Sequence, residues 1–185
     1  MSRILVVYGT TDGHTAKIAQ AIKQRLIVLG HEVDVANAAT SEPQPMSYNG
    51  VIVAASVRAG RYQREVVRWV LDHVPVLNTS TTAFVSVCLG VLQHDAKVDR
   101  DLQMIVDAFL KTTSWHPLET IQVAGALKYT HYNPLVRWFM KRIARKAGGA
   151  TDTSRDYEYT DWAALDRFVD HFSSRFTHVQ IRRAG

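Results

Sequence analysis

The residues best suited to chemistry form a short polar loop, residues 10–15, directly after an apolar run near the N-terminus. Its hydroxyl groups can donate hydrogen bonds to an anion, and Gly13 lets the backbone approach one closely. A helix starting here offers unpaired N–H groups and the positive end of its dipole, which both favour phosphate. The same residue types also build an ordinary turn with a helix cap, and the loop alone leaves both interpretations open. Its members are Thr10, Thr11, Asp12, Gly13, His14 and Thr15.

Other phosphate-binding motifs are absent from the sequence. It has no GxxxxGK followed by Ser or Thr, and no GxGxxG. Their absence argues against a nucleotide triphosphatase and a dinucleotide-binding fold of that type. A phosphate-receiver site needs clustered acids, but the third apolar run continues into residues 55–58 without one. Because loop 10–15 has no Lys or Arg, neutral donors would hold the phosphate, which suits a terminal monophosphate such as that of FMN.

Hydrophobic periodicity predicts strands and helices in alternation along the chain. The predicted strands are 3–9, 33–35, 51–55, 83–87 and 120–124. Helices are predicted over 15–30, 66–74, 102–109 and beyond Thr160, with Thr160 as the N-cap and Asp161 in the first turn. Continuous apolar strands between helices indicate a parallel sheet that is covered on both faces. The expected fold class is α/β, a doubly wound five-stranded parallel sheet, with residues 1–185 in a single domain.

That fold determines where the polar loop must lie. In doubly wound sheets, ligands bind beyond the carboxyl ends of the strands, where the strand order reverses. Loop 10–15 follows the first predicted strand, so we expect it at this edge. The position favours phosphate binding over an ordinary turn.

Positive charge is concentrated in one segment, residues 120–151. This segment holds six of the 22 Lys and Arg and no acid, which leaves 16 basic residues against 17 Asp and Glu elsewhere. It also contains Tyr129, Tyr132, Trp138 and Phe139. A basic, aromatic segment on an otherwise near-neutral chain indicates a docking surface. The six cations are Lys128, Arg137, Lys141, Arg142, Arg145 and Lys146.

A helix is predicted within this segment, from Pro134 to residue 147. At about 100° per residue, Phe139 and other apolar residues share one arc, while Arg137, Lys141 and Arg145 share the opposite arc. This pattern is typical of a helix lying in a membrane interface. It is also that of a surface helix whose apolar arc packs on its own sheet, and both interpretations stay open. Nucleic-acid binding, which a basic aromatic segment also permits, is disfavoured by the phosphate loop and the apolar arc.

The chain resembles the flavodoxins over nearly its whole length. Residues 10–15 are similar to their FMN-phosphate loop, and the loops at 56–62 and 86–90 are similar to the two that flank the flavin ring. The resemblance implies the strand order 2-1-3-4-5, with an insertion at about residues 125–157 in the last strand, as in long-chain flavodoxins. The isoelectric point of about 9.5 departs from ordinary flavodoxins, which are acidic electron carriers.

The insert and its flanks resemble one family more closely, the flavodoxin-type, quinone-dependent protoporphyrinogen IX dehydrogenases of bacterial haem synthesis. The similar stretches are residues 124–129, 138–141, 148–153 and 159–162, together with 55–62. The resemblance implies FMN as cofactor and a three-step oxidation of protoporphyrinogen IX to protoporphyrin IX. Two electrons per step would pass to menaquinone or ubiquinone. The alternative is a flavodoxin-like FMN electron carrier whose basic insert docks a redox partner.

The resemblance also implies candidate site residues. Tyr62 is expected to stack on the flavin or to pack at the start of the next helix, and Arg58 to meet a substrate propionate, the flavin edge or solvent. Cys88 is expected to be a small apolar filler rather than a redox group. No catalytic acid or base is assigned, because the flavin carries the chemistry. With loop 10–15, FMN would be bound by Ser56, Arg58, Tyr62, Ser86, Val87, Cys88, Leu89 and Gly90. Substrate or membrane would be contacted by Lys128, Tyr129, Arg137, Trp138, Phe139, Lys141 and Arg142.

Composition bounds the setting of the protein. No apolar run approaches the roughly 18–20 residues that span a bilayer, and we expect no signal peptide because a strand starts at Arg3. Cys88 is the only cysteine, and the histidines lack metal-ligand spacing, so we expect neither an intrachain disulfide nor a metal site. The expected location is cytoplasmic, bound peripherally to the anionic cytoplasmic face of the inner membrane. No nucleic-acid partner is expected, and homo-oligomerisation is left open.

Overall fold

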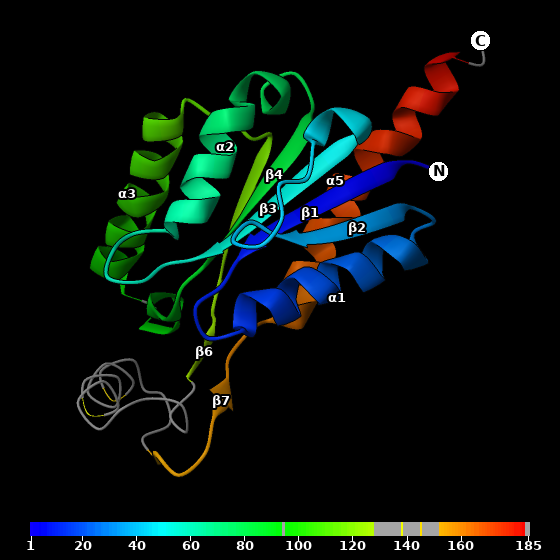
Figure 1. The fold of residues 1–185 in the computed structure, drawn as a ribbon. Helices are drawn as coiled ribbons and strands as arrows, with labels where there is room; N and C mark the ends of the chain where they lie inside the picture. Colours follow the sequence, from blue (N-terminus) through cyan, green and yellow to red (C-terminus); the bar gives the residue numbers. More distant parts are fainter. Residues whose placement is uncertain (94, 128–137, 139–144, 146–151, 184–185) are drawn as a thin grey trace.

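A five-stranded parallel sheet forms the centre of the molecule (Figure 1). The computed structural model describes residues 1–93, 95–127, 138, 145 and 152–183. All neighbouring strands are parallel, and the order reverses between β1 and β3. The predicted fold class and strand order are therefore confirmed. In spatial order, the strands are β2 (Glu32–Asn37), β1 (Arg3–Gly9), β3 (Gly50–Ser56), β4 (Thr81–Val87) and β5 (Glu119–Val123).

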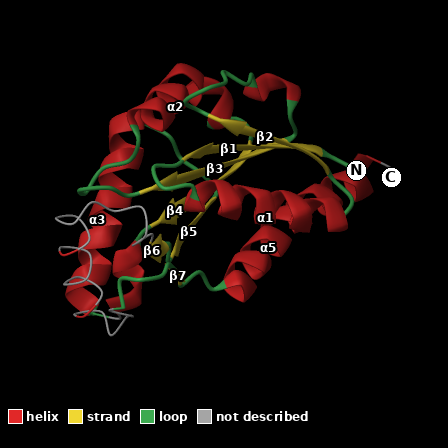
Figure 2. Cartoon of the chain, turned by 60° about the horizontal axis from the view of Figure 1, so that its bottom comes forward, coloured by secondary structure: helices red, strands yellow, loops and turns green. Residues whose placement is uncertain are grey.

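Long helices of the described chain cover both faces of the sheet (Figure 2). Helices α1 (His14–Val28) and α5 (Trp162–Arg183) pack on one face. Helices α2 (Arg64–Leu77) and α3 (Ala96–Thr113) pack on the other. Two short 3₁₀ helices, η1 (Pro45–Ser47) and η2 (Leu89–Gln93), lie in the connections. The three-layer arrangement buries both faces of the sheet, as the apolar strands predict.

The core divides into two clusters because successive strand residues point to opposite faces. In β1, Ile4 and Val6 join the α1 and α5 cluster, whereas Leu5 and Val7 join the α2 and α3 cluster. All four side chains are fully buried. Parallel strands covered on both faces can be apolar at every position, and this explains the uninterrupted apolar runs of the sequence.

The insert begins after β5 and has a small sheet at its base. Strands β6 (Ala126–Leu127) and β7 (Tyr157–Glu158) pair antiparallel with each other, beyond the carboxyl end of the main sheet (Figure 1). The predicted bounds of the insert stay a prediction, whereas the prediction that it divides the last strand is corrected, because β5 ends at Val123 and β6 and β7 pair with each other in a separate sheet. The reason is that, among the described residues, β5 has no strand to pair with beyond Val123. Its neighbour β4 ends at Val87, and after the hydrogen bond from the Cys88 N–H to the Val123 carbonyl the chain that follows β4 turns into η2.

The start of α5 also differs from its prediction. Asp161, not Thr160, is the capping residue, because its Oδ1 accepts the Ala164 N–H at 2.9 Å. The Thr160 hydroxyl instead donates to the Ala124 carbonyl oxygen at 2.7 Å. Thr160 is thus used for a tertiary contact, and the adjacent acid takes over the cap.

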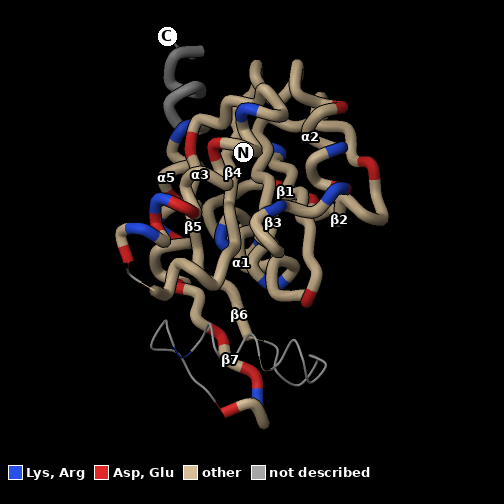
Figure 3. The backbone as a smooth tube through the Cα atoms, turned by 90° about the vertical axis from the view of Figure 1, so that its left-hand side faces the viewer, with Lys and Arg blue, Asp and Glu red and all other residues tan. Residues whose placement is uncertain are grey.

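The predicted amphipathic helix of the insert lies almost entirely outside the described residues. Of the candidate substrate or membrane contacts, the structure describes Trp138, which is helical and 61% exposed. The positions of Lys128, Tyr129, Arg137, Phe139, Lys141 and Arg142 lie outside the described residues. Elsewhere in the described chain, basic and acidic residues are interspersed (Figure 3). None of the helices in that part of the chain is long and apolar enough to cross a membrane.

Candidate functional site: a cavity at the carboxyl edge of the sheet

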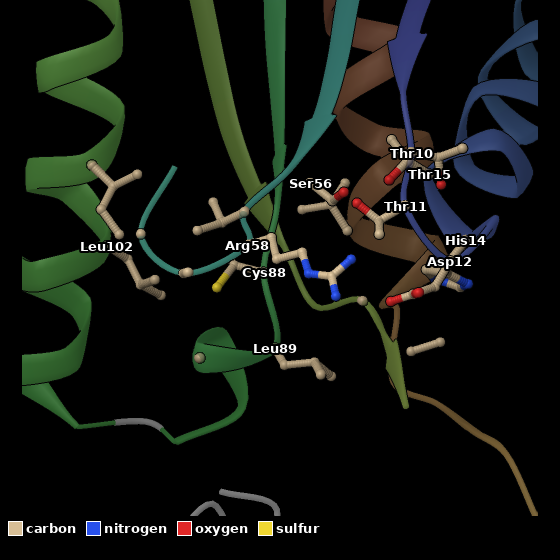
Figure 4. A pocket seen from close by; sticks show the side chains of 18 of the residues that line it. Thr10, Thr11, Asp12, His14, Thr15, Ser56, Arg58, Cys88, Leu89 and Leu102 are labelled. Atoms are coloured by element: carbon tan, nitrogen blue, oxygen red, sulfur yellow. The ribbon is translucent and has the colours of Figure 1, made fainter. Parts of the chain in front are cut away.

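A cavity of about 530 Å³ lies where β1, β3 and β4 end. Its wall is built from the loops that follow these strands, and α3 and the start of the insert complete it (Figure 4). The loop after β1 supplies hydroxyl groups, while the opposite end of the cavity is apolar (Figure 4). A largely apolar cavity with a few convergent polar groups is the usual form of a small-molecule site. The cavity therefore lies where the fold predicts a ligand.

The loop after β1 has the geometry of an anion-binding turn. Gly13 is the N-cap of α1 and has a left-handed backbone with φ of 82°. Its N–H donates to the Thr10 Oγ1 at 2.9 Å, and this bond closes the turn. Helix α1 then starts at His14, so the N–H groups of its first turn have no intrahelical partner. Residues Thr10, Thr11, Asp12, His14 and Thr15 line the cavity.

Gln63 joins the first loop to the second and was not predicted from the sequence. Its Nε2 donates to the Ser56 hydroxyl and, at 3.3 Å, to the Thr11 hydroxyl. Gly9 makes room for this side chain, since a Cβ on Gly9 would lie 2.3 Å from a Val66 methyl carbon and 3.1 Å from the Gln63 Oε1. No sequence pattern marks Gln63, because it lies at the start of a helix and outside any phosphate motif.

The second loop, after β3, carries a cation into the cavity wall. The backbones of Arg58 and Arg61 pair across a tight turn in which Ala59 and Gly60 have φ of 49° and 74°. Ser56, Arg58, Ala59 and Gly60 line the cavity, and the Arg58 guanidinium points toward the first loop (Figure 4). Arg61 lies outside the lining. Of these two arginines, Arg58 is thus the one positioned to meet an anionic or electron-rich ligand.

The third loop, after β4, forms an apolar side of the cavity. Val87, Cys88, Leu89 and Gly90 all line it. Burial raises the pKa of the Cys88 thiol, an effect that a hydrogen bond from the Gly90 backbone partly opposes. The thiol is therefore neutral near pH 7, in keeping with its expected role as an apolar filler.

Tyr62 and Ser86 do not line the cavity, so the prediction that Tyr62 stacks on a flavin is corrected. Tyr62 is 8% exposed and packs against Phe84 and Phe109, at ring-centroid distances of 5.2 and 4.9 Å. Its hydroxyl bonds the buried Ser86 hydroxyl at 2.7 Å. Burial raises the pKa of Tyr62 to about 12. The ring packs in the core beside the start of α2. Of the two alternatives, stacking on a flavin or packing at the start of the next helix, packing is therefore the correct one.

The remaining wall comes from residues that sequence reasoning missed. Val98, Asp101, Leu102 and Ile105 of α3 line the far end of the cavity. Gly125 and Ala126 contribute from the base of the insert. Helical spacing marks Leu102 and Ile105 as apolar, but it does not distinguish a core position from a cavity wall.

A polar network ties the first loop to the base of the insert. The Thr160 hydroxyl spends its hydrogen on the Ala124 carbonyl, so it accepts a hydrogen bond from the His14 Nε2 at 2.7 Å. Glu158 receives the Lys17 ammonium at 2.6 Å and the Trp162 indole N–H at 2.9 Å. The Lys17 hydrogen bond, followed by that of Trp162, holds the pKa of Glu158 below its usual range. The imidazole of His14 thus has a structural role beyond that of its backbone N–H.

The described residues contain no group of three or more His, Cys, Asp or Glu side chains arranged to hold a metal ion. The wall offers hydroxyl and N–H donors at one end and mostly apolar side chains, with Asp101 among them, at the other.

The flavodoxin domain family matches residues 5–154, which covers the sheet, the cavity loops and most of the insert. The chain is also 35% identical over 168 residues to a protein named protoporphyrinogen IX dehydrogenase (quinone) from Escherichia coli K12, covering 90% of this chain and 92% of the relative. The chain belongs to this flavodoxin-type family. A Leishmania major protein of the same name is 32% identical, over 93% of this chain and 75% of the relative. The resemblance predicted from loop and insert residues is therefore confirmed.

Solved structures agree with this family on the fold. A flavodoxin of Streptococcus pneumoniae superposes with a TM-score of 0.59, covering 94% of this chain and 99% of that chain at 16% identity. Flavodoxin 1 of Bacillus cereus gives 0.55, covering 94% and 98% at 14% identity. Such low identity demonstrates a shared fold and no more. Specific function must come from the family and from the site.

Proposed function

We propose that the protein is an FMN-dependent oxidoreductase that converts protoporphyrinogen IX to protoporphyrin IX and passes the electrons to a membrane quinone. The observation that carries the proposal is the phosphate-type loop at residues 10–15, at the switch point of a flavodoxin sheet. Membership in the protoporphyrinogen IX dehydrogenase family supplies the substrate and the acceptor class. The proposed electron acceptor is either menaquinone or ubiquinone.

The residues of the cavity fit FMN. Its phosphate would be held by the hydroxyls of Thr10, Thr11 and Thr15 and by the N–H groups at the start of α1, without a cation in the loop. Donors are plentiful there, since the Thr10 and Thr11 oxygens already accept hydrogen bonds and keep their hydrogens for a ligand. The apolar walls at Val87, Cys88 and Leu89 suit an aromatic ring system.

Side chains in this site bind and orient rather than react. FMN, when bound, supplies the two-electron redox chemistry that no side chain here provides. Arg58 is placed to attract an anionic or electron-rich group over the cavity. Loops 56–60 and 87–90 contribute lining residues from two sides of the cavity. Three two-electron steps remove six electrons and six protons from the porphyrinogen, so each product requires three quinones.

An anaerobic assay tests this proposal. Purified protein loaded with FMN is mixed with protoporphyrinogen IX and a quinone, and porphyrin fluorescence is followed over time. We expect a rate that depends on both protein and quinone. A rate no higher than that of heat-inactivated protein would remove the enzyme proposal.

The second candidate is an FMN electron carrier whose basic insert docks a redox protein. The superposition on flavodoxins favours it, because the fold serves such carriers as well. A carrier would bind FMN and exchange electrons with a partner protein, but it would not oxidise the porphyrinogen with free quinone. The anaerobic assay therefore separates the two candidates.

We further propose that the protein acts at the cytoplasmic face of the inner membrane, bound peripherally to anionic lipid. The basic, aromatic composition of residues 120–151 supports this location. Proposed contacts are Lys128, Tyr129, Arg137, Trp138, Phe139, Lys141 and Arg142. This location would bring the protein close to its proposed electron acceptor, because a lipid-soluble quinone resides in the membrane.

A further inference from the structure

Three hydroxyl groups of residues that line the cavity accept hydrogen bonds from N–H donors of the protein. A hydroxyl has one hydrogen, and an N–H group that donates to its oxygen leaves that hydrogen for another acceptor. Gly13 N–H does this for Thr10, and the Gln63 carboxamide does it for Thr11 and Ser56. All three residues line the cavity. Within the described residues, the structure gives these three hydroxyls no acceptor.

Gln63 is well suited to this task because its amide nitrogen carries two hydrogens. One hydrogen is available for Ser56, which ends β3. The other is available for Thr11 in the loop after β1, 52 positions before Gln63. A carboxylate in the same place would accept rather than donate, and would draw both hydroxyl hydrogens backward. The direction of two cavity hydrogen bonds therefore depends on one side chain.

Local features indicate that this placement has a cost. Gln63 is the N-cap residue of α2, yet its side chain makes no capping bond. Glutamine is also not among the residues that N-cap positions favour. Its Oε1 is buried without a hydrogen-bond partner, which is unfavourable. A residue that breaks local rules in this way is expected where function requires it.

We propose that Gln63 is a positioning residue that fixes the Thr11 and Ser56 hydroxyls as donors toward the cavity. They then donate to the acceptor-rich phosphate and ribityl part of FMN. The inference rests on the proposed FMN site. Gln63 acts through the two hydroxyls and lies outside the cavity lining itself.

The experiment measures FMN affinity by quenching of flavin fluorescence in Gln63→Glu and Gln63→Met. The Gln63→Glu change would reverse both hydrogen bonds, so we expect the dissociation constant to rise at least about tenfold. The Gln63→Met change would release the hydroxyls without reversing them, and we expect a loss of roughly threefold or less. Gln44→Glu is the matched control for charge, because Gln44 is exposed and bonds only the Glu42 carbonyl. Thermal unfolding with and without FMN checks the fold of each variant.

A second background separates hydrogen-bond direction from simple charge repulsion. When Thr11→Val and Ser56→Ala are already present, Gln63→Glu should cost less than about twofold, because no hydroxyl remains to be reversed. An equal loss in both backgrounds, or equal losses for Gln63→Glu and Gln63→Met, would overturn the role of Gln63. Unchanged affinity in Gln63→Glu would do the same. If the wild-type protein itself fails to bind FMN, the proposed function fails as well.

Discussion

The phosphate-type loop depends on a backbone conformation that glycine adopts without strain. Gly13 has φ of 82°, and a Cβ there would meet no atom within 4 Å. A larger residue would thus be disfavoured by the backbone angle, and its side chain would keep a bound ligand farther from the backbone. It would not clash with the protein. Loop function and loop geometry are coupled at this one residue.

Gly13→Val should therefore weaken FMN binding. A left-handed backbone costs a β-branched residue about 1–2 kcal/mol, so we expect the dissociation constant to rise by roughly tenfold. Gly30→Val is the matched control, since Gly30 has φ of 87° at the other end of α1. Flavin fluorescence titration measures both variants, and an equal loss in the two would contradict the assignment of the loop.

Tyr62→Phe tests the corrected position of Tyr62. Removing its hydroxyl leaves the buried Ser86 without that partner, so the free energy of unfolding should fall by about 1–2 kcal/mol. FMN affinity should not change, because the ring lies in the core. Denaturant unfolding and FMN titration provide the two readouts. A large loss of FMN affinity with no loss of stability would restore the stacking interpretation.

At the scale of elements, the first turn of α1 is fastened to the junction of β5, the insert and α5. His14 and Thr160 lie 146 positions apart, and their bond is buried. Thr160 also holds the last carbonyl before the insert, that of Ala124. The start of α1, which follows loop 10–15, and the insert base are thus parts of one hydrogen-bonded unit.

Thr160→Val should break this unit. The Ala124 carbonyl and the His14 Nε2 would lose their shared partner inside the protein, and we expect a loss of about 1–3 kcal/mol in stability. Thr112→Val, at an exposed position of α3, is the control. Equal stability of the two variants in denaturant unfolding would show that the network contributes nothing.

His31 connects the end of α1 to α5 and makes stability depend on pH. Its Nε2 bonds Ser173 at 2.7 Å, and its ring packs edge-on against Phe176. Burial, aided by the N-terminal ammonium, lowers the pKa of His31 in the folded state. As pH falls through about 6.5, the unfolded chain takes up the proton first, so stability decreases.

We expect His31→Gln to be less sensitive to acid than the wild type. The free energy of unfolding should be measured from about pH 8 to pH 5, and the wild-type curve should fall more steeply below pH 6.5. Parallel curves for the two proteins would contradict a lowered pKa at His31.

At the scale of the whole molecule, the net positive charge lies in residues 120–151, because basic and acidic residues nearly balance in the rest of the chain. The cavity opens beside the base of this insert, because Gly125 and Ala126 line it. A membrane-bound insert would bring the cavity close to lipid-soluble quinone. Cations near an anionic surface are worth about 1 kcal/mol each, so such binding would be reversible.

We expect the protein to pellet with anionic vesicles, and added salt should weaken this binding because it screens charge. Deletion of residues 128–147 should abolish pelleting, while neutral vesicles provide the control. A deletion variant that pellets as the wild type does would contradict the membrane role of the insert.

Apolar periodicity alone predicted the alternating strands and helices and the parallel sheet, because these depend on local patterns of apolar residues, whereas the resemblance to flavodoxins supplied the strand order. Strand 3–9 and the loop at 10–15 lie where the pattern predicts them. Partners distant in sequence were decided only by the tertiary structure. Tyr62 packs in the core, and the Thr160 hydroxyl donates to the Ala124 carbonyl. The insert follows β5 because, in the described chain, β5 has no neighbouring strand beyond the end of β4. Gln63 shows the reason most directly, since its two partners become neighbours only when parallel strands bring their carboxyl ends together.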